Sequence, residues 1–437
     1  MRLTFKELKD QIAKVVPKDI PYTVELEAGN IAIVTPVPAK FGGGDGLIGK
    51  IAKRVKRKIV LRPDESIMKS EDEAKKLVHE IVPEEAEITN LYFDACYREI
   101  IIQCMNPGEA VGRRGANLNA IRDQTGWLVK VERTSPIISK TVHDIRGYRQ
   151  ANSTERRKLL KDFGLNIHRP QRPGSAWARV TALGSYREVG RACHFVTTNE
   201  SRVMIDVGVN IASDTDPMPY FTAPEALPLE KLDAVVLTHS HLDHAGMLPV
   251  LFKYGYRGPV YCTPPTRDLM LLLQTDYLKV GGSEGKRAPY DMEDIRTCMK
   301  HVVDVNWGET TDIAPDIKLT FSNAGHILGS SAVHLHIGDG KHNIVFSGDQ
   351  KYEKSWLFDA ANTRFPRVET LVIESTYGAS GDYQPSRQEA NQELQDIVSR
   401  TIARGGKLIC PVFAVGRSQE VMIAIDELFR SGQVKPV

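Results

Sequence analysis

Short apolar runs that end in a polar residue recur through the second half of the chain. Continuous apolar runs of this length are typical of buried strands. One covers 232–238 and leads into His239, and three others have the same form: 203–206 ending in Asp206, 319–326 ending in His326, and 343–349 ending in Asp349. Open α/β sheets carry their chemistry at the carboxyl ends of their strands. The pattern therefore predicts an α/β domain with polar side chains gathered at one sheet edge.

The densest polar group is the segment 239–244, with the sequence His-Ser-His-Leu-Asp-His. The apolar run before it predicts a strand, and the run 245–252 after it predicts the first turns of a helix. His239 and His241 alternate, so they direct two ring nitrogens to the same side, while Asp243 and His244 can reach a second ion. Nitrogen and oxygen donors of this kind suit zinc. We interpret this loop as a metal site.

The order of these residues resembles that of the metallo-β-lactamase superfamily. The resemblance implies an αβ/βα sandwich of four layers with a site for two Zn²⁺ ions. It implies that one ion is held by His239, His241, His326 and Asp349, and that the second is held by Asp243 and His244 with Asp349 between the two ions. In the same scheme Asp206 orients the histidine loop.

Two later stretches look like the β-CASP subgroup of that superfamily, whose members act on nucleic acids. They are Glu374-Ser-Thr-Tyr-Gly378 and the segment 405–420, which leads into an amphipathic helix. Arg417 suits a phosphate because its guanidinium is planar and bidentate, although a solvated helix start is the alternative. The resemblance implies a zinc-dependent ribonuclease in which two ions clamp the phosphate for in-line attack. It also implies catalytic roles for three carboxylates. Asp243 binds the second ion, Glu374 orients the nucleophile or a downstream histidine, and Asp206 orients the histidine loop.

The family that this chain resembles is in turn similar to the endonuclease subunit of the cleavage and polyadenylation specificity factor. This resemblance implies internal cutting of single-stranded RNA, with 5′–3′ exonuclease trimming as an added activity, in RNA 3′-end formation and transcription termination. Two alternatives stay open. One is a non-catalytic RNA-binding scaffold with structural zinc, and the other is a small-molecule metallo-hydrolase such as a thioesterase.

The N-terminal third has a different pattern. A strand-like run over 96–104 is followed by Gly112-Arg113-Arg114-Gly115, a helical run over 116–124 and a second strand over 127–132. This order resembles a KH domain, in which a Gly-x-x-Gly loop clamps the nucleic-acid backbone because glycine lets the main chain come close. Arg113 and Arg114 then suit phosphate.

An earlier glycine-rich stretch over 43–49 predicts a second KH-like module with unusual spacing. It is followed by a basic run that includes Lys50, Lys53 and Arg54, for which a solvated helix face is the alternative. A helix is expected over 71–81, and the sequence leaves open whether it belongs to this module or the next.

These patterns divide the chain into five parts. Module 1 is KH-like and covers 1–70, module 2 covers 71–145, a basic linker covers 146–176, a metallo-β-lactamase-like domain covers 177–385, and an incomplete β-CASP domain begins over 386–437. The linker either guides RNA to the metal site or is a charged spacer. The subgroup carries two further histidines downstream, whereas no histidine follows His342 here. We therefore expect a C-terminally truncated member of the archaeal type.

Composition limits the kinds of binding partner and the cellular compartment that we expect for this protein. The net charge is only +2, so RNA contact must come from local basic patches. The six cysteines are scattered, which fits free thiols in a reducing cytoplasm. No apolar run approaches the ~20 residues that a membrane span requires. We expect a cytoplasmic protein that binds single-stranded RNA and the transcription machinery, with no membrane association and with a homodimer in the full-length form.

Overall fold

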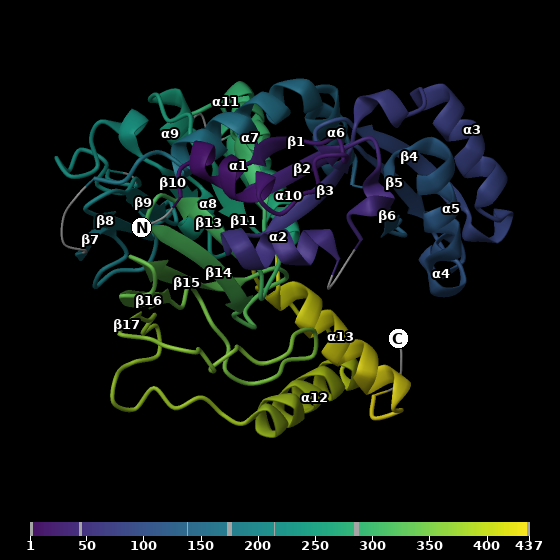
Figure 1. Cartoon of the computed structure of the whole chain (residues 1–437). Coiled ribbons are helices and arrows are strands. Elements are labelled where there is room, and N and C mark those ends of the chain that lie inside the picture. The colour runs from purple at the N-terminus through teal and green to yellow at the C-terminus, as the bar shows by residue number, and fades with distance from the viewer. Residues whose placement is uncertain are drawn as a thin grey trace.

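The computed structural model describes residues 3–42, 46–137, 139–172, 177–213, 215–283 and 288–434 of the chain. Two small modules precede a larger domain built on two sheets, and a pair of helices follows (Figure 1). Part of the predicted glycine-rich loop, Gly43 to Asp45, lies outside the described residues.

The two modules share one topology. Module 1 contains α1 (Phe5–Ala13), β1 (Thr23–Glu27), β2 (Asn30–Thr35), α2 (Leu47–Val55) and β3 (Ile59–Pro63). Module 2 contains α3 (Glu71–Ile81), β4 (Ile88–Asp94), β5 (Glu99–Cys104), α4 (Pro107–Val111), α5 (Ala116–Thr125) and β6 (Leu128–Arg133). In each sheet the first two strands are antiparallel, and the third runs parallel to the middle one. The repeated strand order supports the interpretation of both modules as KH-like.

Helix α3 belongs to module 2. It begins where Ser70 and Glu73 form a capping box, in which each side chain accepts a hydrogen bond from the other residue's backbone N–H. Its buried residues Ala74 and Val78 join the core that holds Ile100 of β5. The chain is therefore better divided before Ser70, and module 1 does not include this helix.

The basic linker is folded into two helices, α6 (Lys140–Ala151) and α7 (Ser153–Ile167). The boundary predicted between 145 and 146 falls inside α6, so the division is better drawn before Lys140. The arginines of this segment form ion pairs with carboxylates on both sides: Arg146 with Asp268, Arg149 with Asp304, Arg156 with Asp94, Arg157 with Glu25 and Glu65, and Arg169 with Asp233. These five arginines are engaged inside the chain, whereas Lys158 and Lys161 of the same segment are exposed.

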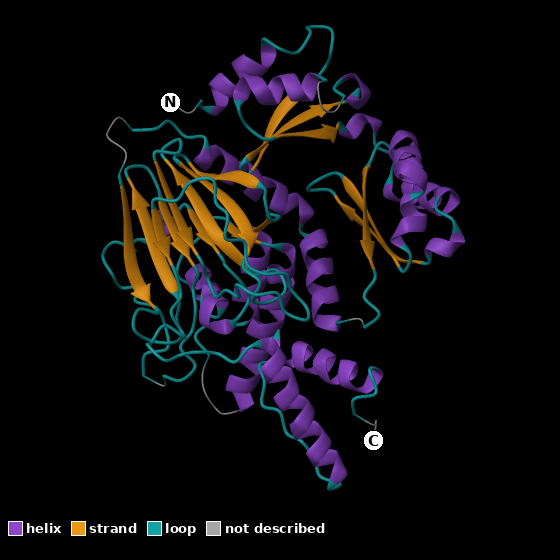
Figure 2. Cartoon of the chain, turned by 90° about the horizontal axis from the view of Figure 1, so that it is seen from below, coloured by secondary structure: helices purple, strands orange, loops and turns teal. Residues whose placement is uncertain are grey.

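The larger domain consists of two facing sheets. The first has the order β12-β11-β10-β9-β8-β7 and comprises β7 (Ala178–Gly184), β8 (Cys193–Thr198), β9 (Arg202–Ile205), β10 (Ala234–Val236), β11 (Val260–Cys262) and β12 (Val302–Asp304). The second has the order β13-β14-β15-β16-β17 and comprises β13 (Thr310–Ala314), β14 (Ile317–Asn323), β15 (Ser331–Ile337), β16 (His342–Phe346) and β17 (Thr370–Val372). Figure 2 shows these sheets beside the smaller sheets of the modules.

Apolar side chains fill both faces of the first sheet. Between the sheets, Val203 and Val236 pack with Phe321, Leu335 and Phe346 in one buried core. The opposite face is covered by α8 (Leu242–Ala245), α9 (Leu248–Lys253), α10 (Pro264–Ser283) and α11 (Met292–His301). Strands buried on both faces explain the unbroken apolar runs in the sequence.

Two further helices, α12 (Arg387–Ala403) and α13 (Arg417–Arg430), pack on each other through Val398 and Leu428. The segment that leads into α13 passes the histidine loop, where Phe413 lies against His241 with ring centroids 6.2 Å apart. Among the described residues, no helix is both long enough and apolar enough to cross a bilayer.

Candidate metal centre

Asp206 organises the loop that carries the histidines. Strands β9 and β10 are parallel neighbours, so Asp206 and Thr238 reach the same sheet edge. The buried carboxylate accepts hydrogen bonds from the backbone N–H and the hydroxyl of Thr238, both at 2.7 Å, and lies 2.7 Å from Nδ1 of His244. A Cβ at Gly208 would lie 1.6 Å from the carbonyl oxygen of Asp243, so glycine is required where the two segments cross.

A first donor group contains His239, His241, His326 and Asp349, whose ligand atoms all lie within 4.8 Å of one another. Nδ1 of His241 lies 3.2 Å from Nε2 of His239 and 3.2 Å from Nε2 of His326. Oδ2 of Asp349 is 3.6 Å from Nε2 of His326 and 4.0 Å from Nε2 of His239. These four side chains come from the ends of β10, β14 and β16.

A second donor group contains Asp243, His244 and Asp349. Nε2 of His244 is 3.1 Å from Oδ1 of Asp349 and 3.8 Å from Oδ2 of Asp243. Asp349 directs one carboxylate oxygen to each group, so it connects two adjacent donor sets.

The donor geometry fits zinc. Two nitrogens bound tetrahedrally to one Zn²⁺ lie roughly 3.3 Å apart, because each Zn–N bond is about 2.0–2.1 Å. The two 3.2 Å separations around Nδ1 of His241 agree with this spacing. Zinc is a good match for these nitrogen and carboxylate donors, but the same donors also accept other divalent transition metals.

The electrostatics keep the ligands in their binding forms. Burial opposes the charged form of Asp349, but His244, His239 and His326 outweigh it and hold its pKa well below the usual range. Burial, aided by neighbouring imidazoles, lowers the pKa of His326 to about 4 and that of His239 well below its ordinary value. Neutral imidazole is the form that binds metal.

His244 differs from the other histidines of the site. Burial favours its neutral form, but the adjacent carboxylates of Asp206 and Asp349 raise its pKa well above the ordinary value. A cation between His244 and Asp349 would replace that proton, since metal binding to imidazole releases protons.

The segment before α13 supplies a contact that sequence reasoning missed. Nε2 of His241 lies 3.2 Å from the carbonyl oxygen of Val415. Donation of an N–H to this carbonyl leaves Nδ1 of His241 as the metal-binding nitrogen. Every residue has a backbone carbonyl, so no sequence signal marks Val415. Thr238 was also missed, although its place directly before His239 is a usable signal.

Two predicted residues, Glu374 and Arg417, belong to neither donor group. Glu374 follows β17, where its carboxylate accepts the backbone N–H of Thr376 at 2.9 Å and its own N–H donates to Ser347 at 3.1 Å. Arg417 is exposed at the start of α13, 3.5 Å from Glu420, and its charge contributes to the lowered pKa of His326.

Apart from Arg417, the residues predicted to bind RNA lie on the modules. Gly112 and Gly115 both have positive φ angles, of 71° and 77°, and the intervening Arg113 and Arg114 are exposed. On α2, Lys50, Lys53 and Arg54 are exposed, and Arg54 donates a hydrogen bond to Gln11.

Comparison with known proteins agrees with this architecture. A model of the metallo-beta-lactamase superfamily matches residues 186–396, and a model of the KH domain of transcription termination factor FttA matches residues 2–68. The chain is 49% identical over 432 residues to transcription termination factor FttA of Methanosarcina mazei, covering 99% of this chain and 68% of that protein.

More distant relatives have the same name. Identity is 46% with the Thermococcus kodakarensis protein, covering 98% of this chain and 68% of the relative, and 41% with the Lokiarchaeum protein, covering 100% and 69%. The chain therefore spans about two thirds of the length of these curated relatives.

Proposed function

This chain belongs to the family of transcription termination factor FttA. From that membership we propose that it hydrolyses phosphodiester bonds of single-stranded RNA at a centre that holds two zinc ions. We propose that this cleavage serves the termination of transcription. The supporting observation is the pair of donor groups that share Asp349. Zinc bound there would activate water and stabilise the charge on a phosphate in transit.

The residues of the chain prepare the centre for this chemistry. Asp206 fixes His244 and the start of the loop, and the Val415 carbonyl fixes the orientation of His241. Arg417 is proposed to hold a phosphate beside the metal ligands. Glu374, which follows β17, is proposed to orient the nucleophile that attacks the phosphate.

RNA would be delivered by the N-terminal modules. Arg113 and Arg114 extend from a loop whose two glycines have positive φ angles, and the absence of a Cβ at these glycines lets the main chain approach a nucleic-acid backbone. The exposed lysines of α2 add a second basic surface. A role in termination also brings the protein to RNA polymerase, which we propose as its protein partner.

The two alternatives predict different products. A scaffold with structural zinc would bind RNA and metal without cutting, and a thioesterase would release a thiol from a small substrate. Membership of a termination factor family and the two KH-like modules favour a nucleic-acid substrate over a thioester.

The test uses single-stranded RNA labelled at either end and incubated with the zinc-loaded protein. We expect internal cuts that disappear after chelation, and that disappear in His241→Ala and Asp243→Ala while RNA binding persists. Asp396→Ala, an exposed carboxylate change on α12, is the matched control. Intact RNA with zinc retained would support the scaffold, and cleavage that survives both substitutions would contradict the proposed centre.

A further inference from the structure

One aromatic side chain lies against the donor histidines and is otherwise open to solvent. Among the described residues, Phe413 is the only phenylalanine, tyrosine or tryptophan in ring contact with a donor histidine, with its ring centroid 6.2 Å from that of His241. Phe413 is 75% exposed. A single exposed apolar residue needs no special explanation, but this ring lies beside the ligands at which the reaction is proposed to occur.

Hydrogen bonds fix the backbone that carries this ring. The carbonyl oxygen of Phe413 accepts the backbone N–H of Ser418 at 3.3 Å, and the carbonyl oxygen of Ala414 accepts the Ser418 hydroxyl at 2.8 Å. The next carbonyl, that of Val415, lies 3.2 Å from Nε2 of His241 and ties the same segment to the metal centre. The ring is thus presented by a backbone that is already held in place, which lowers the entropy lost when a ligand binds to it.

Positive charge accompanies the ring. Arg417 begins α13 directly after this segment, and its charge acts on His326. Lys351 is tied to the loop of His326, because its backbone N–H donates to the carbonyl oxygen of Ala324 at 2.9 Å. Glu420 lies 3.5 Å from Arg417 and offsets part of this charge. Aromatic rings together with cations are the combination that binds single-stranded nucleic acid, because cations follow the backbone while rings stack on the bases.

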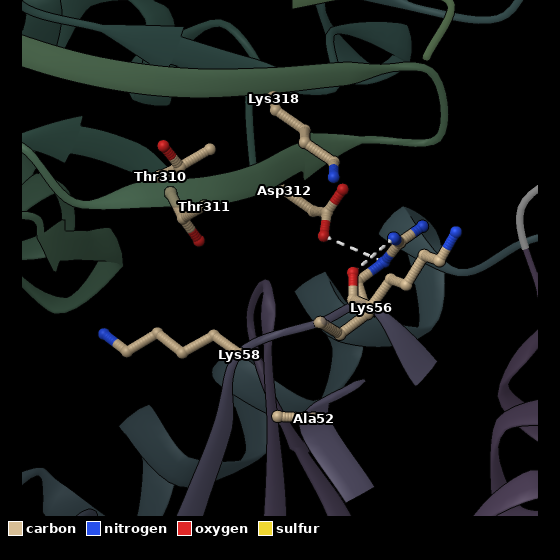
Figure 3. Close-up of a pocket in the computed structure, with 8 residues that line it drawn as sticks. Ala52, Lys56, Lys58, Thr310, Thr311, Asp312 and Lys318 are labelled. Carbon is tan, nitrogen blue, oxygen red and sulfur yellow. Dashed lines mark hydrogen bonds and ion pairs between the residues drawn. The ribbon is translucent and has the colours of Figure 1, made fainter. Parts of the chain in front are cut away.

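Module 1 is joined firmly to the domain that carries the metal centre. Nε of Arg57 is 3.1 Å from Oδ2 of Asp312 on β13, with only 10% and 6% of these side chains exposed. Figure 3 shows Asp312 facing Lys56 at the end of α2. Salt screens buried ion pairs little, so this pair restrains the module against the second sheet. KH modules take unpaired RNA, so a strand that runs from a module to the metal centre would arrive with its bases free to stack.

We propose that Phe413 stacks on an unpaired base of single-stranded RNA, in a nucleotide adjacent to the phosphate at the metal centre. The stack holds that nucleotide while its phosphate lies at the donor groups, so Phe413 binds the substrate and is not a metal ligand. Every base has a π-face, so this contact positions the RNA without selecting a sequence. The inference rests on the proposed function, because it requires RNA at the metal centre.

The test titrates single-stranded RNA at several salt concentrations in an Asp243→Ala background, in which the RNA is not cut. Phe413→Ala should weaken binding about 5- to 150-fold, the range for one lost stack between a base and an aromatic ring. The slope of log K against log salt should not change, because the ring carries no charge. Phe413→Tyr keeps the ring and should keep the affinity.

The matched control is Ile409→Ala, which truncates an apolar residue of the same segment that is 86% exposed. It should bind RNA as the unmodified background does. A second measurement uses RNA that contains 5-iodouridine, which forms photo-crosslinks with aromatic rings stacked on it. The crosslink should map to the peptide that contains Phe413 and should be lost in Phe413→Ala.

Four results would overturn the proposal. Unchanged affinity in Phe413→Ala, alongside weakened binding in Arg113→Asp/Arg114→Asp, would remove the stacking site but leave the proposed function in place. Equal losses in Phe413→Ala and Ile409→Ala would make the segment a general apolar surface. Loss of zinc from Phe413→Ala in a chain that keeps Asp243 would mean that the ring acts only by supporting His241. If the wild-type protein bound no RNA at all, both the stacking site and the proposed function would be wrong.

Discussion

Replacing Asp206 by Asn should weaken metal binding without removing any metal ligand. The carboxylate accepts two hydrogen bonds from Thr238 and one from Nδ1 of His244, each at 2.7 Å. Asparagine has the same shape, but one of its two side-chain positions becomes an NH₂ donor. That donor would face a hydroxyl or an N–H that now donates to Asp206, so at least one of the three bonds is lost.

The magnitude follows from what these bonds do. Loss of a hydrogen-bond partner behind a metal-binding histidine typically lowers metal affinity by about 10–100-fold, which corresponds to about 1.4–2.7 kcal/mol. The negative charge of Asp206 also helps to hold His244 in place, because Asp206 is only 1% exposed and little solvent screens the pair. We therefore expect Asp206→Asn to lie near the upper end of that range.

The assay is a competition titration of zinc between the protein and a chromogenic chelator, with folding checked by circular dichroism. Asp233→Asn is the matched control. Asp233 is also a buried carboxylate, 6% exposed, and it accepts from Asn166, Arg169 and the backbone of Arg202, away from the donor groups. It should lose stability but keep zinc affinity. Equal zinc affinity in Asp206→Asn and wild type would refute the role assigned to Asp206.

Two other predictions concern RNA binding and the stability of the fold at low pH. Replacing Arg113 and Arg114 by Asp should weaken single-stranded RNA binding and lower its salt slope by about 1.4, with zinc content unchanged in elemental analysis; an unaltered slope would make the loop a simple turn. Burial lowers the pKa of His301 to about 4, below the 6.5 of an exposed histidine. The unfolded chain therefore takes up a proton first, and stability should fall as the pH drops from about 6.5 to 4. In His301→Gln, urea denaturation at pH 7.5 and 5 should show a smaller loss than in wild type, and an equal loss would contradict this assignment.

Local signals account for the elements that were predicted well. Helix α3 has the predicted bounds, 71–81, because a Ser70–Glu73 capping box marks its start and Ala74 and Val78 lie on one helical face. The histidine loop lies between a strand and a helix as predicted, since the apolar run before it is buried on both faces of a sheet. Both donor groups consist of residues that were named from the order of the motif.

Long-range pairing limited the rest of the prediction. A run of arginines has the same sequence pattern whether it faces water or a carboxylate far along the chain. Arg149 is 6% exposed and pairs with Asp304 at 3.6 Å, and Arg156 is 2% exposed and pairs with Asp94 at 3.4 Å. Neither acidic partner is adjacent in sequence, so the sequence alone predicts a charged spacer or an RNA guide and does not predict these buried ion pairs.

These buried pairs have a consequence for how RNA would reach the metal centre. Removing one partner of a buried ion pair costs about 3–5 kcal/mol, because a charge is left without compensation. Arg156 ties α7 to Asp94 of module 2, while Arg149 ties α6 to Asp304 at the end of β12. Two such anchors on consecutive helices oppose rotation of the module against the larger domain. On the proposed function, RNA held by Arg113 and Arg114 would then be presented to the larger domain from a module whose orientation these two pairs restrict.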